Sequence, residues 1–306
     1  MPSAWLCFRP TGTGPADGPS RGPDIGAEPL VHAHHESMHV LKSYAGRWAV
    51  VTGASSGIGA EFVRQLAVRG MHCVLVARRE DRLRELERET ESAHGIRCEI
   101  VTADLSLPHA GRELLAEVKR RGITIDLLVN NAGVGLVSSV EGTDVTRALE
   151  VIQVNVVSLT ELTLLAAQEM VTRGRGGIIN VGSVVSFQPV GYMGVYAASK
   201  AYVLHFSEAL WAELRPHGVT VTTLCPGTTR TEFFDHSGVP GWAERMRGQD
   251  VTTVVRTGLE AFESGRHYVV PGWKNYLVSL ASRFATRATV AKASMSIHRP
   301  RAETHV

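Results

Sequence analysis

Ser183, Tyr196 and Lys200 are the residues whose types and spacing could do chemistry together. Tyr196 and Lys200 lie four positions apart in a segment of helical propensity, so both side chains should project from one helix face. An ammonium beside a phenol favours the phenolate and should lower the pKa of Tyr196 from about 10, which would make it a usable proton donor and acceptor. Ser183 could hydrogen-bond to a carbonyl oxygen that Tyr196 protonates. The trio predicts carbonyl reduction or its reverse, although a spaced Tyr and Lys alone is a common coincidence.

A glycine-rich turn predicts a nucleotide site. Trp48–Val51 is a short apolar run that leads into Gly53, Gly57 and Gly59, after which residues 58–68 continue with helical spacing. A strand-to-helix turn directs backbone N–H groups and the positive end of the helix dipole at one place, which suits phosphate groups. Gly57 would let a pyrophosphate approach, and Gly59 would let the helix pack on the strand. The spacing differs from the commoner Gly-x-Gly-x-x-Gly fingerprint, so a plain surface turn is the alternative.

Two adjacent arginines indicate which nucleotide binds. Arg78 and Arg79 follow the second predicted strand, where an NAD site would carry an acidic residue. Arginines at the start of a helix oppose its dipole, so the 2′-phosphate of NADP(H) would explain their presence. Pairing with Glu80 or Asp81 in solvent is the alternative. We predict NADP(H) rather than NAD(H), with Arg78 as a ligand.

From Gly46 onward, short apolar runs alternate with amphipathic segments, which is typical of βαβ units. The predicted strands are Trp48–Thr52, His72–Ala77, Arg97–Thr102, Ile125–Asn130, Gly177–Val181, Thr220–Cys225 and His267–Val270. The predicted helices lie near residues 57–69, 80–92, 109–121, 144–173, 196–214 and 251–264. We expect an α/β fold over residues 46–272: one Rossmann-type, doubly wound domain with a seven-stranded parallel sheet flanked by helices. Asp104 and the run Asn130–Gly133 follow the third strand and close the fourth, where such sheets bind ligands, although helix caps or turns are the alternative.

Composition excludes several functional classes. The chain has 306 residues, 44% of them hydrophobic, and a net charge of +2, which is too mild to predict nucleic-acid binding. Its four cysteines are widely separated, which suits reduced thiols rather than a disulfide scaffold. No run of about 18 apolar residues and no secretion signal is recognisable. We therefore expect a cytoplasmic protein.

Residues 1–45 differ from the rest of the chain. The stretch 11–29 is rich in Gly, Pro and Ser and lacks periodicity, which predicts disorder. His35–His39 matches the H-E-x-x-H zinc pattern, but the match adjoins a tail without supporting elements, so we interpret it as coincidence and predict no metal site. The break in composition also suggests that translation starts at Met38, a hypothesis that detection of peptides from residues 1–37 of the endogenous protein would reject.

Together these segments resemble the classical branch of the short-chain dehydrogenase/reductase family. The resemblance covers Arg47 to about Gly272, and Ser183 precedes Tyr196 by 13 positions, as in that family. The matching positions are Thr52-Gly53-Ala54-Ser55-Ser56-Gly57-Ile58-Gly59, Asp104-Leu105, Asn130-Asn131-Ala132-Gly133, Asn155, Ser183, Tyr196, Lys200, Pro226-Gly227 and Thr231.

The resemblance implies hydride transfer between the nicotinamide of NADP(H) and a carbonyl or alcohol carbon. It implies that Tyr196 is the general acid and base, that Ser183 positions the substrate oxygen, and that Lys200 tunes Tyr196 and binds the nicotinamide ribose. Asn155 would hold a water in a proton relay to Lys200. The implied cofactor-binding residues are Gly53, Ser55, Ser56, Gly57, Ile58, Gly59, Arg78, Asp104, Leu105, Asn131, Ala132, Gly133, Tyr196, Lys200, Pro226, Gly227 and Thr231. The family also suggests a homodimer or homotetramer, consistent with predicted helices near 144–173 and 196–214 that are apolar on more than one face.

Two other functions share this fold. A non-catalytic NADP-binding regulator is one, although the complete set of Asn155, Ser183, Tyr196 and Lys200 argues against it. A sugar-nucleotide epimerase or dehydratase is the other, although such enzymes usually have a different glycine spacing and a larger substrate domain.

Residues 231–250 correspond to the variable substrate lid of the family. Glu232–His236 mixes aromatic and acidic residues, and Gly238, Pro240 and Gly241 predict mobility or a sharp turn. With Met193 nearby, this favours a hydrophobic carbonyl substrate, whereas simple packing of the lid on the domain is the alternative.

Residues 273–306 form a C-terminal amphipathic extension. Leu277, Leu280 and Phe284 share one helical face. The nearby charges are basic: Arg283, Arg287 and Lys292. Such a segment could lie on an acidic membrane surface, and packing on its own core or on a second subunit is the alternative.

Overall fold

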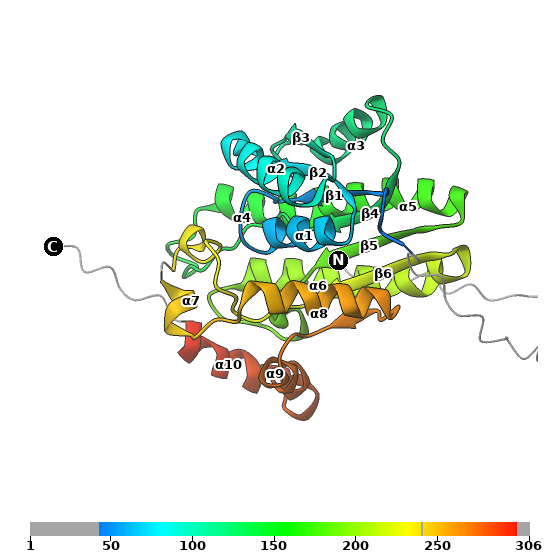
Figure 1. The fold of residues 1–306 in the computed structure, drawn as a ribbon. Coiled ribbons are helices and arrows are strands. Elements are labelled where there is room, and N and C mark those ends of the chain that lie inside the picture. Colours follow the sequence, from blue (N-terminus) through cyan, green and yellow to red (C-terminus); the bar gives the residue numbers. More distant parts are fainter. Residues whose placement is uncertain (1–42, 240, 299–306) are drawn as a thin grey trace, which may run out of the picture. The chain divides into compact units, whose positions relative to one another are not determined.

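A seven-stranded parallel sheet forms the centre of the computed structural model, which describes residues 43–239 and 241–298 (Figure 1). The strands lie in the order β3-β2-β1-β4-β5-β6-β7, which confirms the predicted α/β, Rossmann-type fold. Their bounds are Trp48–Thr52 (β1), His72–Ala77 (β2), Cys98–Thr102 (β3), Ile125–Asn130 (β4), Gly176–Val181 (β5), Val219–Leu224 (β6) and Tyr268–Val269 (β7). The predictions for residues 11–29, His35–His39, Met38, Pro240 and residues 299–306 lie outside the described residues.

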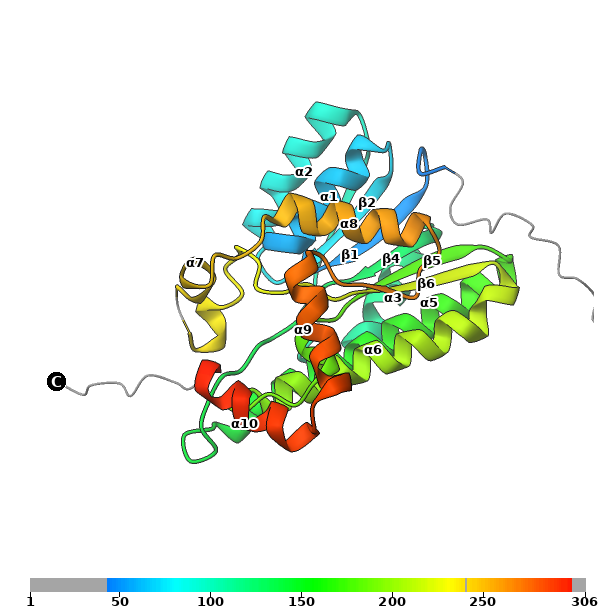
Figure 2. The same cartoon turned by 90° about the horizontal axis from the view of Figure 1, so that it is seen from below.

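Helices cover both faces of the sheet (Figure 2). One face carries α1 (Gly57–Val68), α2 (Glu80–His94) and α8 (Val251–Glu263), and the other carries α3 (Ala110–Arg120), α5 (Leu159–Arg173) and α6 (Gly194–Leu214). Side chains that alternate along a strand point to opposite faces. In β1, Ala49 and Val51 pack under α1 and α8, while Val50 packs toward α3 and α5. Because both faces are covered, the strands read as continuous apolar runs.

The order of the strands reverses beside β1, which pairs with β2 on one side and with β4 on the other. Such a reversal opens a crevice at the carboxyl ends of the strands. Thr52 links the end of β1 to the segment after β4, because its hydroxyl accepts from the backbone N–H groups of Asn131 and Ala132, both at 3.0 Å. The Asn131 amide in turn donates to the carbonyl oxygens of Thr52 at 2.9 Å and Gly53 at 3.2 Å.

The helix predicted over residues 144–173 is interrupted. It consists of α4 (Val145–Ile152), a π-helical turn at Gln153–Ser158, and α5. Val145–Arg173 as a whole, 29 residues, is long and apolar enough to cross a membrane by length and composition. However, Leu162 and Met170 of α5 are fully buried among core residues beneath the sheet, as in a core helix of a soluble domain.

The end of the described chain adds three helices. α7 (Trp242–Arg245) lies in the predicted lid, and α9 (Trp273–Phe284) and α10 (Arg287–His298) replace the single amphipathic segment that the sequence predicts. In both views α10 lies at the same end of the molecule as α7 (Figures 1 and 2). Gly238 and Gly241 have positive φ angles of 89° and 67°, in agreement with the sharp turns predicted for the lid.

Candidate active site

Tyr196 and Lys200 project from the first turns of α6, as their spacing predicts. Both side chains are buried, with 7% and 4% of their surface exposed. The Lys200 ammonium lies 5.9 Å from the centre of the Tyr196 ring and donates to the carbonyl oxygen of Val181, at the end of β5, at 2.7 Å. This hydrogen bond fixes the long lysine side chain beneath the phenol.

The pKa of Tyr196 contradicts the prediction from its spacing to Lys200. Burial raises the pKa of Tyr196 to about 12, and a hydrogen bond from Ser183 only partly opposes that rise. Burial also lowers the pKa of Lys200 to about 8. The charge of the ammonium alone would lower the pKa of Tyr196, but the cost of desolvating both groups is the larger effect at this depth.

Ser183 caps a short 3₁₀ turn, Val184–Phe187, directly after β5. Its hydroxyl accepts from the N–H of Val185 at 3.3 Å and lies 3.5 Å from the carbonyl oxygen of Pro226. The hydroxyl of Ser186 accepts from the N–H of Ser183 at 3.2 Å, which completes a reciprocal cap. The backbone around Ser183 is therefore held rigidly, with its side chain beside Tyr196.

Asn155 lies in the π-helical turn and is fully buried. Its amide pairs with the backbone of Val134 in both directions, accepting from the N–H and donating to the carbonyl oxygen, each at 2.9 Å. The second amide hydrogen goes to the Ser199 hydroxyl at 3.0 Å. Asn155 therefore fixes the segment after β4 to α6, and π-helical turns often serve such functional positions.

Gly53, Gly57 and Gly59 of the first turn each lie so close to neighbouring atoms that a larger residue would not fit. A Cβ on Gly53 would lie 2.7 Å from the Asn131 amide nitrogen, and one on Gly57 would lie 2.9 Å from the Thr231 methyl. Gly53 and Gly57 also have positive φ angles of 67° and 54°. A Cβ on Gly59 would lie 2.2 Å from the carbonyl oxygen of Gly53, so this glycine allows the close packing of α1. The turn at the start of α1 can therefore cradle a phosphate with exposed N–H groups.

A cavity of about 540 Å³ joins the glycine turn to Tyr196. It brings together residues that are far apart in the sequence and that are predicted to bind the cofactor or to act in catalysis. They are Gly53, Ser55, Ser56, Gly57, Ile58, Arg78, Asp104, Leu105, Asn131, Ala132, Gly133, Ser183, Tyr196, Lys200, Pro226, Gly227 and Thr231. Gly59 and Asn155 do not line the cavity, because they act in packing and in positioning, respectively. The shape and the glycine cradle fit a dinucleotide such as NADP(H).

Arg79 contacts the glycine turn, whereas Arg78, the predicted ligand, does not. Arg79 donates to the hydroxyls of Ser55 and Ser56, the shortest contact being 2.8 Å, and to the Glu232 carboxylate at 3.0 Å. Arg78 is 65% exposed and lies 4.0 Å from the Asp104 carboxylate. The opposing helix dipole applies equally to both arginines, so the sequence carried no signal that separates them.

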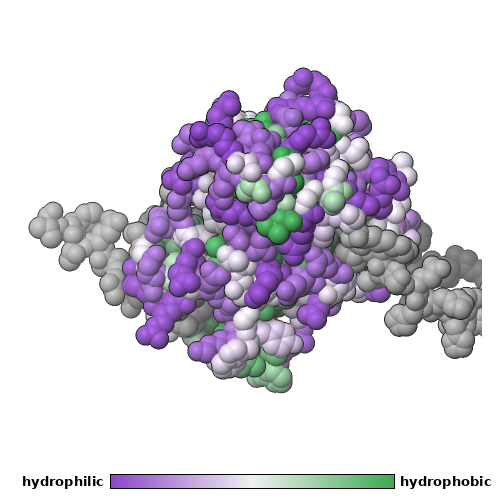
Figure 3. Space-filling model, viewed as in Figure 1, coloured by the Kyte–Doolittle hydropathy of each residue, from purple (hydrophilic) through white to green (hydrophobic). Residues whose placement is uncertain are grey.

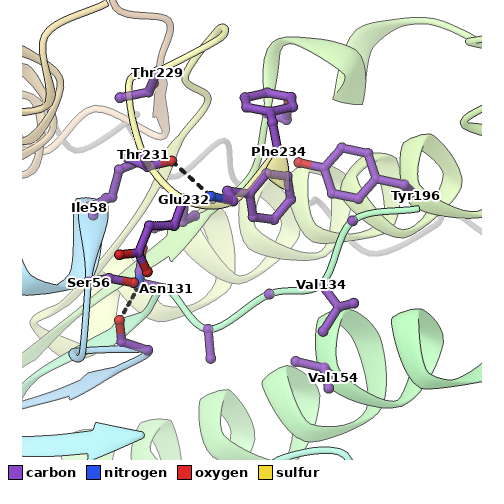
Figure 4. Close-up of a pocket in the computed structure, with 18 of the residues that line it drawn as sticks. Ser56, Ile58, Asn131, Val134, Val154, Tyr196, Thr229, Thr231, Glu232 and Phe234 are labelled. Atoms are coloured by element: carbon purple, nitrogen blue, oxygen red, sulfur yellow. Dashed lines mark hydrogen bonds between the residues drawn. The ribbon is translucent and has the colours of Figure 1, made fainter. Parts of the chain in front are cut away.

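Apolar side chains surround Tyr196 in the cavity, whose lining also includes the ion-paired Arg147 and Glu150. The Tyr196 hydroxyl points into the cavity toward the segment that carries Thr231, Glu232 and Phe234 (Figure 4). The rings of Tyr196 and Phe233 lie 5.7 Å apart. The remaining apolar lining is contributed by Val137, Val184, Val185, Met193, Phe234, Val239 and Trp242. A carbonyl that reached Tyr196 would have its substituents among apolar side chains.

Comparison with known proteins agrees with this geometry. The sequence model of the family described as short chain dehydrogenase matches residues 47–238. Rat 17-beta-hydroxysteroid dehydrogenase type 3 is 34% identical over 206 residues, which are 66% of this chain and 67% of the rat protein. Very-long-chain 3-oxoacyl-CoA reductase from Bos taurus is 32% identical over 81% of this chain and 83% of the bovine protein. A human relative, 31% identical over 61% of this chain and 57% of the relative, is named inactive hydroxysteroid dehydrogenase-like protein 1.

The match to several relatives is partial. The chain spans 61% of the length of hydroxysteroid dehydrogenase-like protein 1 from Gallus gallus, to which it is 32% identical over 66% of its own residues. Among solved structures, a short-chain dehydrogenase from Sphingobium yanoikuyae in complex with NADPH has a TM-score of 0.71 and 30% identity. This likeness covers 85% of this chain and 98% of the other.

Proposed function

Since this chain belongs to the short-chain dehydrogenase/reductase family, we propose that it is an NADP(H)-dependent oxidoreductase that interconverts a hydrophobic ketone or aldehyde and its alcohol. The observation that carries the proposal is the position of the Tyr196 hydroxyl: it lies among apolar side chains at one end of a cavity whose other end is the glycine turn. Families with this fold host several functions, so the site and not the fold supports the activity.

The residues around the reacting atoms have separate roles in the proposed reaction. When bound, the nicotinamide cofactor supplies or accepts the hydride. Tyr196 donates a proton to the carbonyl oxygen during reduction and takes it back from the alcohol during oxidation. Ser183 holds that oxygen by a hydrogen bond. Lys200, whose pKa is lowered to about 8, returns a proton to the phenol from beneath.

The preference for NADP(H) is supported by two arginines at the adenosine end. Arg78 and Arg79 border the cavity, and Arg79 already binds the Glu232 carboxylate, so this guanidinium can hold an anion in this position. One solved structural relative is a complex with NADPH. The residues that would hold the cofactor are those of the glycine turn, the two arginines and the segment after β4.

The proposed substrate is bulky and apolar. Relatives named as a hydroxysteroid dehydrogenase and a very-long-chain 3-oxoacyl-CoA reductase support this class, as does the lining by Met193, Phe233 and Phe234. The proposed location is the cytoplasm, supported by three buried free thiols, Cys73, Cys98 and Cys225.

We propose that the protein is a homo-oligomer that associates through α4 and α5. These helices expose an apolar strip on the surface opposite their packed side. Its members are Leu149 and Ile152 of α4, Val157 of the π-helical turn between the two helices, and Leu164 of α5. Burying such a strip against a second copy would remove it from water, which is the usual driving force for association.

A carbonyl panel followed by NADPH absorbance tests the activity. The panel contains steroid ketones, 3-oxoacyl thioesters and aromatic aldehydes, each with NADPH and with NADH. Tyr196→Phe should lower kcat/KM at least 100-fold while 2′,5′-ADP still binds, because only the proton donor is removed. NADPH binding by the wild type without turnover of any carbonyl would favour a non-catalytic protein, and one human relative is named inactive.

A further inference from the structure

Helix α9 presents its apolar side to solvent. Trp273, Tyr276, Leu277, Leu280 and Phe284 recur at spacings of three and four residues, so they form one stripe along the helix, called the α9 stripe below. Trp273 is 70% exposed and Phe284 88%, and Leu280 is half-buried. The side that packs inward carries the small polar residue Ser279, which is buried. A helix that served only its own core would show the reverse distribution.

The orientation of α9 is fixed by polar contacts on its inner side. Asn275 donates to the side chain of Gln249 at 2.7 Å and to the carbonyl oxygen of Pro271 at 3.0 Å. It also packs against Gly227, where an added Cβ would lie 2.4 Å from the Asn275 amide nitrogen. The α9 stripe therefore cannot turn toward the core without breaking these contacts. In Figure 3, pale and green residues appear at the bottom of the view, where Figure 1 places α9.

The charged residues on α9 and α10 themselves are all basic. No Asp or Glu occurs between Glu263 and Glu303 in the sequence. Lys274 and Arg283 flank the stripe on its two sides, since a rotation of 100° per residue places them to either side of Trp273 and Leu280. Arg287 and Lys292 of α10 extend the basic surface.

We propose that the α9 stripe and its basic flanks dock on the surface of an anionic lipid bilayer. Tryptophan and tyrosine favour the interface between headgroups and acyl chains, and leucine and phenylalanine reach into its apolar boundary. Lysine and arginine beside the stripe meet anionic headgroups, which the cytoplasmic leaflet supplies. A second copy of this chain fits less well, because pairing two such stripes would bring like charges together.

Docking of this kind brings the bilayer near the catalytic cleft. In α10, the Ser294 hydroxyl accepts from the N–H of Gly191 at 2.9 Å, and Met295 packs on the same glycine, two residues before Met193. The docked surface would therefore lie beside the segment that leads to Tyr196. That this serves a lipophilic substrate rests on the proposed function, whereas the docking surface itself does not.

Vesicle flotation of the full chain tests the proposal. Vesicles of phosphatidylcholine alone are compared with vesicles containing 30% phosphatidylserine, at 50 mM and 500 mM salt. We expect flotation with the anionic vesicles at low salt and at least tenfold less at high salt. A triple variant with Trp273→Ser, Leu277→Ser and Phe284→Ser should bind at least tenfold more weakly, because it lacks the apolar part of the contact. The matched control carries Val68→Ser, Leu107→Ser and Val140→Ser, which are similarly exposed but lie elsewhere, and it should float like the wild type.

Two further measurements distinguish loss of membrane docking from loss of folding. Brominated lipids should quench the fluorescence of Trp273 on binding, and Trp273→Phe should lose that quenching while still floating. Binding of 2′,5′-ADP should be equal in all variants, which checks that each is folded. Failure of the wild type to bind anionic vesicles at 50 mM salt would overturn the proposal. So would a triple variant that floats normally but no longer self-associates in light scattering, because the stripe would then be an interface between copies.

Discussion

Lys200 holds an ammonium in one of the least hydrated places in the molecule. Burial lowers its pKa from 10.5 to about 8, so the folded state resists the charge that the unfolded chain carries freely. Below about pH 8 Lys200 is charged in both states, so the folded state bears the full free-energy cost of burying the charge. Between pH 8 and 10.5 the unfolded state binds more protons than the folded state, so the free energy of unfolding rises with pH. If Lys200 has the role proposed above, catalysis and stability are therefore opposed at this residue.

Replacement of Lys200 by methionine should stabilise the protein while abolishing turnover. The shift in pKa corresponds to about 3 kcal/mol, from which the lost hydrogen bond to Val181 removes about 1 kcal/mol, leaving a gain of about 2 kcal/mol at pH 7. Above pH 10.5 the penalty is absent and only the lost hydrogen bond remains, so the variant should be about 1 kcal/mol less stable than the wild type there. Urea unfolding at several pH values measures it, with exposed Lys119→Met as the control. A destabilised Lys200→Met protein at pH 7 would contradict this prediction.

In the proposed reaction, the phenol of Tyr196 sets the pH dependence of carbonyl reduction and of alcohol oxidation. With its pKa raised to about 12, Tyr196 is protonated at neutral pH and ready to donate, whereas oxidation needs the phenolate. We expect kcat/KM for alcohol oxidation to rise close to tenfold per pH unit between about pH 7 and 10, and kcat/KM for carbonyl reduction to stay flat between about pH 6 and 8. Steady-state profiles in both directions measure this. An oxidation profile that has already levelled off at pH 7 would contradict it.

At the scale of elements, Glu232 connects the lid to the start of α2. Its carboxylate binds Arg79 at 3.0 Å and approaches Arg82 at 3.7 Å. The same Arg79 guanidinium reaches the Ser55 and Ser56 hydroxyls of the glycine turn. A carboxylate held by the arginine that borders the cofactor cavity competes with a cofactor phosphate for that arginine.

Glu232→Gln should therefore raise affinity for 2′,5′-ADP about two- to fivefold and leave 5′-AMP almost unchanged, since an exposed ion pair is worth up to about 1 kcal/mol. Isothermal titration calorimetry measures both ligands. Glu80→Gln, which removes a carboxylate paired with Arg84 on the same helix, is the matched control and should change neither. Equal changes for the two nucleotides would show that Glu232 does not compete with the 2′-phosphate.

The elements themselves could be predicted well from the sequence, because periodicity and glycine placement report them directly. The predicted β1, β2 and β4 have the observed bounds, and β6 is displaced by one residue, at Val219–Leu224 instead of Thr220–Cys225. The π-helical turn at Gln153–Ser158 could not be predicted, because its residues have the same apolar character as an ordinary helix. The split between α9 and α10 was missed for a similar reason, since Ala285 and Thr286 are neither glycine nor proline.

At the scale of the whole molecule, the prediction of the site used motifs at the carboxyl ends of the strands. In a parallel sheet these ends all lie at the same edge of the sheet. This is why Ser183, Tyr196 and Lys200 could be predicted to meet. The contact between Arg79 and Glu232 could not, because the two residues are 153 positions apart and an ion pair at the surface follows no sequence period. The pKa of Tyr196 also depends on burial by several segments at once, which no local pattern reports.

Association of two or more copies is the last prediction at this scale. We expect multi-angle light scattering to show a dimer or tetramer, and Leu149→Glu with Leu164→Glu to shift it toward monomer, because both side chains are exposed on the proposed interface of α4 and α5. Val68→Glu on α1, exposed to a similar degree, should leave the assembly unchanged. A wild-type protein that is monomeric at about 50 μM, a concentration where a dimer with a 1 μM dissociation constant would predominate, would contradict the prediction.

The π-helical turn that carries Asn155 contains one residue more than a regular helix needs. Deletion of one residue from this turn would join α4 and α5 into one continuous α-helix. The Asn155 side-chain amide would then be rotated away from the backbone of Val134. The sheet, the glycine cradle and the tyrosine would all survive such a deletion in the gene. A homologue with such a deletion would lose catalytic activity and still keep all the motif residues that identify an active enzyme of this kind.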